Sequence, residues 1–211
     1  YMATGLGLTG LTAYFVAITP SLFNAIYGTP FYWVVALAPL GFVFYLSARL
    51  HRISFSKAQT MFWLFAGVMG LSMAYIFIAF TGTSIARVFF ITAGTFAGMS
   101  LYGYTTKKDL SGWGSFLFMG LIGIIIASIV NIFLKSPMLY YVISCIGVLV
   151  FVGLTAYDTQ RIKEMYYATD TAEISGKKAI MGALKLYLDF INLFIMLLHF
   201  CLLYTSPSPR D

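Results

Sequence analysis

The sequence predicts an all-α membrane protein, a bundle of seven transmembrane helices. Two observations lead to this fold class. The 211 residues are 60% hydrophobic and only 9% charged, whereas soluble domains contain about 25% charged residues. Apolar runs of about 20 residues, enough to cross a hydrocarbon core of roughly 30 Å, also recur along the whole length. Because no stretch remains for a sizeable soluble domain, residues 1–203 are expected to form a single transmembrane domain.

Glycine, proline and short polar stretches separate the apolar runs. Pro20 follows the first run, Gly82 follows the third and Pro137 follows the fifth. Because the intervening loops are short, consecutive helices are expected to be antiparallel neighbours. The seven expected spans are Met2–Ile18, Phe31–Ala48, Ala58–Phe80, Ile85–Tyr104, Leu110–Leu134, Met138–Tyr157 and Ala179–Leu203.

Both ends of the chain are expected to depart from a native protein. The chain enters an apolar run directly from Tyr1, without a polar leader, which indicates a truncated N-terminus. The charged n-region and cleavage site of a signal peptide are missing from this segment. Residues 204–211, YTSPSPRD, resemble a translated adapter and are expected to be a non-native tail.

The basic residues alternate between loops. The loops after the second, fourth and sixth runs are basic, whereas the opposite loops contain only Lys135, with Arg87 near a helix end. By the positive-inside rule the basic loops are cytoplasmic, so the N-terminus lies inside and the C-terminus outside. The net charge of +6 is scattered over short loops, without a basic helix or stacking platform, and does not indicate nucleic-acid binding. The cytoplasmic set is Arg49, Arg52, Lys57, Lys107, Lys108, Arg161, Lys163, Lys177 and Lys178.

Two aspartates within the apolar runs are the candidate functional residues. Asp158 lies at the cytoplasmic end of the sixth run and Asp189 lies inside the seventh. A charge in such surroundings is costly, so the fold or the function must compensate for it. At 1.5 Å per residue, Asp189 lies about 16 Å beyond Lys178, near mid-membrane, and Asp158 lies about 8 Å from Lys163. Helix tilt and uncertain helix ends leave room for the two carboxylates to approach.

A pair of carboxylates in a site of low dielectric would titrate as a unit, with one apparent pKa raised, and would therefore sense pH. The same oxygens are the hard ligands that calcium prefers, with main-chain carbonyls or water completing the shell. A metal site is therefore expected at Asp158 and Asp189, with calcium as the bound or transported ion. The alternative, an aspartate held by an arginine or asparagine for helix packing, stays open on this reasoning.

Three further polar residues could modulate the pair. Lys185 precedes Asp189 by one helical turn and Asn192 follows it by three residues, so all three share a face that points away from lipid. Lys185 could instead extend towards the cytoplasm. Arg161, three residues after Asp158, is a candidate local partner for that carboxylate.

The sequence contains no motif that indicates an enzyme. GxSxG and HExxH are both absent, and no other nucleophile and base are paired. Cys145 and Cys201 lack metal-ligand spacing, and His51 and His199 are expected to be rim and packing residues. A lysine in the last of seven helices suggests a retinal protein, but the third run contains no acidic residue to serve as counter-ion. No cofactor is expected.

Small residues at a spacing of four predict close helix packing. Gly94 and Gly98 form a GxxxG pair, and Gly123 with Ala127 offers another small face. Such faces let transmembrane helices approach closely.

Long motifs resemble the Bax inhibitor family of membrane proteins, in its bacterial branch. They are GLTAYDTQRIK over residues 153–163 and MGALKLYLDFINLF over 181–194, and the stretch SLYGYTTKKDLSGWGSFLFMGLIG over 100–123 is similar to the same branch. The resemblance covers essentially everything before residue 204. It implies a seven-helix bundle with the last helix surrounded by the others, in the inner membrane of a bacterium.

The resemblance also implies a pH-sensitive calcium leak governed by two aspartates. By motif these are Asp158 in AYD and Asp189 in LYLDF. An arginine at the end of the second helix is implied to latch the first aspartate, and Arg52 is the best positional match, with Arg49 a close rival. Lys185 departs from the family, whose members usually have a small polar residue there.

Two other functions stay open beside the channel. Bacterial members of the family are similar to proteins that modulate a membrane-bound quality-control protease, which gives a regulatory alternative with that protease as partner. A proton-coupled carrier would use the same aspartates as a relay. The partners expected on the channel reading are membrane lipid, calcium and protons.

Overall fold

The structure, a computed structural model, describes residues 1–49 and 52–205, with side chains described up to residue 200. Its described residues form α-helices and no strand, which confirms the all-α prediction. Six helices are long and apolar enough to cross a membrane, and a seventh span results if the bent pair α1–α2 is one span. The helices are α1 (Met2–Ile18), α2 (Pro20–Tyr27), α3 (Phe31–Arg49), α4 (Phe55–Met73), α5 (Ile76–Ala79), α6 (Gly82–Thr105), α7 (Ser111–Leu134), α8 (Pro137–Glu164) and α9 (Ala172–Thr205).

The first predicted span, Met2–Ile18, coincides with α1 and is followed by a bend at Pro20. The chain turns by 100° between α1 and α2, where Thr19 is extended, with φ −110° and ψ 93°, and Pro20 opens the next helix. Proline cannot donate the backbone hydrogen bond that would continue α1, but its fixed φ suits a first helical position. The predicted end of the first run at Ile18 is confirmed, whereas α2 was not predicted.

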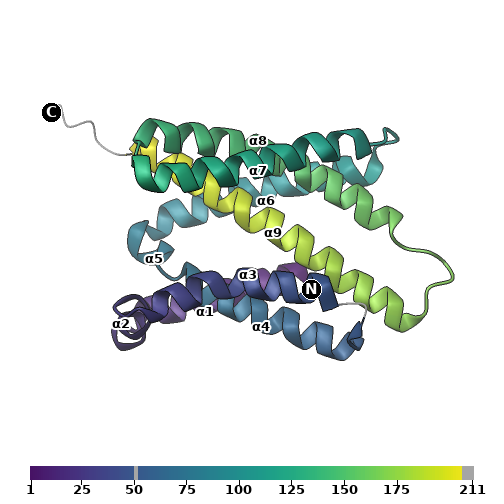
Figure 1. The fold of residues 1–211 in the computed structure, drawn as a ribbon, viewed down its shortest axis with the longest axis horizontal. Coiled ribbons are helices and arrows are strands. Elements are labelled where there is room, and N and C mark those ends of the chain that lie inside the picture. The colour runs from purple at the N-terminus through teal and green to yellow at the C-terminus, as the bar shows by residue number, and fades with distance from the viewer. Residues whose placement is uncertain (50–51, 206–211) are drawn as a thin grey trace. The chain divides into compact units, whose positions relative to one another are not determined.

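The helices form two compact units that share α9 (Figure 1). The first unit contains residues 1–82 and 165–187, and the second contains residues 83–164 and the chain from Leu188 onward. The boundary in α9 therefore lies between Tyr187 and Leu188. Half of the most apolar 18-residue window of α9 is buried, the largest share among the candidate spans.

The first unit is held together by apolar packing and one buried polar contact. Its core includes Ala13, Val16 and Val35 from α1 and α3. The hydroxyl groups of Thr9 and Tyr187 share a hydrogen bond of 2.6 Å, and Thr9 also donates to the Ala66 carbonyl at 2.8 Å. These bonds connect α1, α4 and the first half of α9 in a place where an unsatisfied hydroxyl would be costly.

In the second unit, α7 packs along α8 and the second half of α9 packs against both α6 and α8. The Phe190 ring of α9 lies 5.5 Å from Phe96 of α6, measured between ring centroids. α6 approaches α8 so closely that a Cβ on Gly103 would overlap the Ala156 carbonyl. The apolar core contains Leu117, Ile124, Ile143, Val150, Phe151, Leu154 and Leu193.

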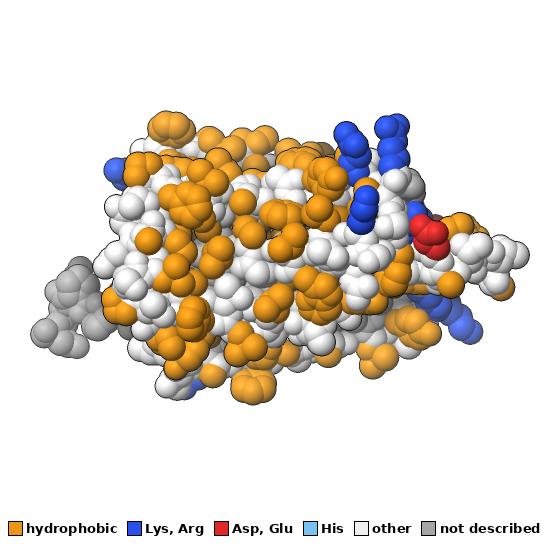
Figure 2. Space-filling view, turned by 90° about the horizontal axis from the view of Figure 1, so that it is seen from below, with side chains coloured by type: hydrophobic (Ala, Val, Ile, Leu, Met, Phe, Trp, Pro, Cys, Tyr) orange, Lys and Arg blue, Asp and Glu red, His pale blue; other side chains and the backbone are white. Residues whose placement is uncertain are grey.

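The outer surface is apolar, as expected of a chain surrounded by lipid. Hydrophobic side chains cover much of the face drawn in Figure 2. Only 11% of the most apolar window of α7 is buried, so most of this helix presents its side chains outward. An apolar surface of this extent is unusual for a soluble monomer. The chain is therefore a multi-pass membrane protein.

The close helix contacts do not use the glycines that the GxxxG pattern selected. A Cβ built on Gly94, Gly98 or Gly123 meets nothing within 4 Å. The prediction that these residues mediate helix contacts was therefore wrong. Spacing of small residues marks a flat helix face but does not say whether that face meets a helix or lipid. The tight approaches include Gly103 and Gly114, where a Cβ would lie 2.5 Å from the Tyr157 ring.

We expect Gly103→Ala to lower the apparent melting temperature of the detergent-solubilised protein by several degrees, because a Cβ there must push α6 away from the α8 backbone. Gly94→Ala, on the same helix, is the matched control. It should be neutral or slightly stabilising, since alanine is the better helix former and nothing lies near its Cβ. Equal melting temperatures for the two variants would contradict the close α6–α8 contact.

Candidate functional site

Asp189 lies in the second unit, on the buried side of α9. Its exposed fraction is only 5%. The next residue, Phe190, packs edge-on against Phe96 and Phe89 of α6, at 5.5 Å and 5.6 Å between ring centroids. A carboxylate in such apolar surroundings keeps its charge only if other polar groups compensate for the lost water.

One contact fixes how α8 and α9 are aligned. A Cβ built on Gly147 of α8 would lie 2.8 Å from the Met196 sulfur of α9. Phe151 and Leu154, one and two turns further along α8, share an apolar cluster with Leu193 of α9. Because residues three and four apart lie on one side of a helix, these residues define the facing stripes of the two helices.

Both aspartates continue these facing stripes. Asp158 is four residues after Leu154 on α8, and Asp189 is four residues before Leu193 on α9. The two helix segments run in opposite directions (Figure 1), so both continuations lead towards the same end of the unit. At 1.5 Å per residue, Asp158 lies about 16 Å along α8 from Gly147, and Asp189 lies about 10 Å along α9 from Met196. By helix geometry, the aspartates are therefore offset by about one turn along the axis.

The C-terminal end of α8, which carries Asp158, is anchored by a buried glutamine. The exposed fraction of Gln160 is 6%. Its side-chain amide donates to the Lys108 carbonyl and its side-chain oxygen accepts from the Leu110 N–H, both at 2.8 Å. These two bonds hold the loop between α6 and α7 against α8. Sequence reasoning missed Gln160, although a polar residue within the GLTAYDTQRIK motif was a signal for it.

A second polar group that the sequence did not indicate lies on α6. The Ser100 hydroxyl is buried and forms no hydrogen bond within the described residues. Ser100 precedes Gly103 by one turn, and Gly103 lies against Ala156, two residues before Asp158. A serine in an apolar helix is too common to be selected from sequence alone.

Arg161 has a local partner other than the predicted one. Its guanidinium lies 3.5 Å from the Glu164 carboxylate, with both side chains about half exposed, and 6.0 Å from the centre of the Tyr157 ring. An exposed ion pair of this kind contributes little to stability. The pairing of Arg161 with Asp158 stays a prediction.

The two predicted modulators on α9 differ in environment. Lys185 is exposed, and Asn192 is partly buried, with its amide donating to the Leu188 carbonyl at 2.8 Å. The Asn192 amide therefore satisfies a carbonyl of its own helix. The proposed effect of Lys185 on Asp189 stays a prediction.

The two candidate latch residues belong to the first unit, whereas Asp158 belongs to the second. Arg49 ends α3 and Arg52 follows in the turn before α4, and both are exposed. The latch stays a prediction.

The remaining candidates include two histidines and two cysteines. His199 packs edge-on against Tyr140, with 5.1 Å between ring centroids, which agrees with a packing role. Cys145 is a partly buried free thiol. His51 and the Cys201 side chain lie outside the described residues.

The metal site expected at Asp158 and Asp189 stays a prediction. Among the described residues, no three or more His, Cys, Asp or Glu side chains gather where they could hold a metal ion. Two aspartates would therefore need hydroxyl, carbonyl or water oxygens to complete the six to eight ligands of calcium.

Two carboxylates outside the spans have lowered pKa values. Hydrogen bonds from Ser111 lower the pKa of Asp109, and bonds from the Lys178 ammonium and the Tyr167 N–H lower the pKa of Asp170. A lowered pKa means that these groups stabilise the fold above the ordinary value of about 3.9 and lose that effect only as pH falls through the lowered pKa. Neither changes charge in the neutral range.

The helices define a multi-pass helical membrane protein with a buried carboxylate, Asp189, in α9. The family model described as "Inhibitor of apoptosis-promoting Bax1" matches residues 1–205. An uncharacterized protein of Rickettsia prowazekii is 48% identical over 95% of this chain and 85% of its own length. "Inner membrane protein YbhL" of Escherichia coli K12 is 47% identical over 94% of this chain and 86% of its own. The chain belongs to the Bax inhibitor family.

Proposed function

We propose that the protein is a pH-sensitive calcium leak of the bacterial inner membrane, controlled by Asp158 and Asp189. The observation that carries the proposal is the burial of Asp189, 5% exposed, in the most buried candidate span. Ionisable residues inside membrane spans usually mark ion or proton pathways. The proposed location is supported by the Escherichia coli relative, which is named an inner membrane protein.

The proposed mechanism follows from the coupling of two like charges. With both carboxylates ionised, the site carries two negative charges and attracts a divalent cation. In low dielectric the charges also repel each other, so one carboxyl takes up a proton more readily than an isolated aspartate. The shared proton reduces the charge of the site and replaces the cation with a hydrogen bond. Proton and calcium thereby compete for the same oxygens.

The closed state is proposed to use a latch at the cytoplasmic rim. Arg52, or failing that Arg49, pairs with Asp158, because a guanidinium can hold a carboxylate through two parallel hydrogen bonds. Arg161 is a weaker candidate for this role, since Glu164 already lies beside it.

We expect Asp158→Asn and Asp189→Asn each to abolish most of the pH response of calcium flux in liposomes between pH 6 and 8, because they keep the shape but remove the titrating group. The double variant should be no worse than the more affected single variant, since either change breaks the pair. Asp170→Asn is the matched control, because Asp170 titrates below the neutral range. A full pH response in both Asn variants would make the aspartates structural and favour the regulatory function.

Lys185→Ser separates two roles of the lysine in the same assay. If the Lys185 ammonium holds Asp189 ionised, its removal should strengthen the pH response. If the lysine extends to the cytoplasmic surface, the pH response should stay the same.

Arg52→Ala is expected to raise the basal calcium leak several-fold, because it releases Asp158. Arg49→Ala tests the rival latch residue. Lys57→Ala is the control for the loss of a nearby positive charge. Flux at fixed pH and membrane potential measures the effect. An unchanged leak in both arginine variants would contradict the latch without affecting the aspartate pair.

A further inference from the structure

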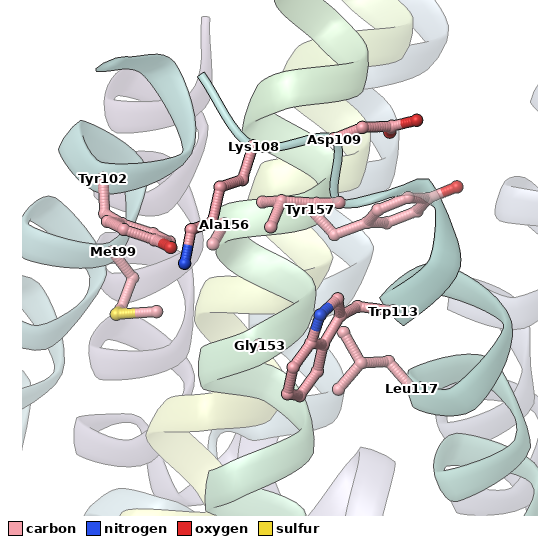
Figure 3. A pocket seen from close by; sticks show the side chains of 10 residues that line it. Met99, Tyr102, Lys108, Asp109, Trp113, Leu117, Gly153, Ala156 and Tyr157 are labelled. Carbon is pink, nitrogen blue, oxygen red and sulfur yellow. The ribbon is translucent and has the colours of Figure 1, made fainter. Parts of the chain in front are cut away.

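A cavity of about 300 Å³ opens in the second unit, between the ends of α6, α7 and α8 and the loop that joins α6 to α7. Figure 3 shows it from close by. Its lining is mainly apolar, with one lysine and one aspartate. The residues that matter for its chemistry are Met99, Tyr102, Lys108, Trp113, Leu117 and Ala156.

The Lys108 side chain is directed into this cavity. Figure 3 shows its ammonium group between Tyr102 and Ala156. The backbone that carries the side chain is fixed at three points: the Lys108 carbonyl accepts from Gln160, the Leu110 N–H donates to Gln160, and the Lys108 N–H donates to Thr106 at 3.3 Å. Among the described residues the Lys108 ammonium takes part in no salt bridge. The Lys108 ammonium is therefore held at the cavity by its backbone and has no carboxylate partner among the described residues.

The neighbouring carboxylate does not neutralise this lysine. Asp109 accepts the Ser111 N–H at 2.8 Å, and Figure 3 shows its carboxylate turned away from the Lys108 ammonium. The attraction of Arg161 also contributes to lowering the pKa of Asp109. The side of the cavity next to Lys108 is left positive.

The rest of the cavity suits an apolar chain. Met99 and Leu117 supply apolar wall, and Gly153 and Ala156 form a floor without large side chains. The lining also contains Trp113, which is 64% exposed, and Tyr102, which is 45% exposed. Exposed tryptophan and tyrosine near the end of a membrane span are typical of the interface between lipid headgroups and the hydrocarbon core.

We propose that this cavity binds one anionic phospholipid of the cytoplasmic leaflet, with the phosphate against the Lys108 ammonium and the start of one acyl chain along Met99 and Leu117. A volume of about 300 Å³ is at the lower end for ligand pockets. It accommodates a glycerol phosphate and a short length of chain, while the remaining lipid lies on the exposed apolar surface of α6 and α7. Basic pockets between spans on the cytoplasmic side are suited to anionic headgroups.

An inorganic phosphate or another small soluble anion fits the cavity less well. Such an ion would leave the apolar wall around Met99 and Leu117 unfilled. A phospholipid satisfies both parts of the cavity from the surface on which it already lies. The proposal does not depend on calcium transport.

Native mass spectrometry of the full chain in detergent tests the proposal, with phosphatidylglycerol, phosphatidylcholine and soluble glycerol 3-phosphate as probes. Phosphatidylglycerol should bind several-fold more tightly than phosphatidylcholine. Lys108→Gln should weaken phosphatidylglycerol binding by about five-fold, which corresponds to about 1 kcal/mol for one basic residue. Lys107→Gln is the matched control, because Lys107 is equally exposed but does not line the cavity, and it should change binding little.

Two further variants separate the parts of the site. Lys108→Arg keeps the charge and should retain binding, which shows that a loss in Lys108→Gln is not misfolding. Met99→Trp fills the cavity and should weaken binding of both lipids without changing the charge. Equal effects of Lys107→Gln and Lys108→Gln, or equal binding of the two lipids, would overturn the proposal. Competition by glycerol 3-phosphate at concentrations similar to those of the lipid would assign the site to a soluble phosphate compound instead.

Discussion

The structure depends most on the burial of one carboxylate, Asp189, inside an apolar helix. A charged group in such surroundings costs several kcal/mol unless it is protonated, paired or hydrated. The core of the unit that contains Asp189 is built mainly from aromatic and aliphatic side chains. On the proposed function, the proton or the charge of Asp189 is what requires a carboxylate at this position.

Three helices of the second unit approach one another closely around the polar residues. Glycines bring α6, α8 and α9 close together at Gly103 and Gly147, and the same helix faces carry Ser100, Asp158 and Asp189 towards one end of the unit. Gln160 then fixes the end of α8 to the loop that follows α6. Close helix contacts and positioned polar groups thus occur in the same part of the unit. Inside a membrane, polar groups are tolerated where they are buried in protein and away from lipid.

Hydropathy was enough to predict the fold class and six of the spans, because transfer from water to lipid dominates the energy of each long apolar run. The break at Pro20 was predicted, but the short helix α2 was missed, because eight residues are too few to stand out as an apolar run of about 20 residues. The GxxxG glycines were misassigned, since spacing does not reveal what a face meets. Gln160 and Ser100 were missed because their importance comes from tertiary neighbours. The latch and the aspartate pair remain predictions.

The most direct test of the central claim is to measure the protonation of the two aspartates themselves. Infrared difference spectra of the protein in lipid, recorded between pH 8 and pH 5, detect the carbonyl stretch of a protonated carboxyl group. A coupled pair predicts one carboxyl band that appears well above the ordinary aspartate pKa of about 3.9, shifts with isotopic labelling of aspartate, and disappears in both Asp158→Asn and Asp189→Asn. A band that persists unchanged in either variant, or the lack of any aspartate band in this range, would contradict the shared proton.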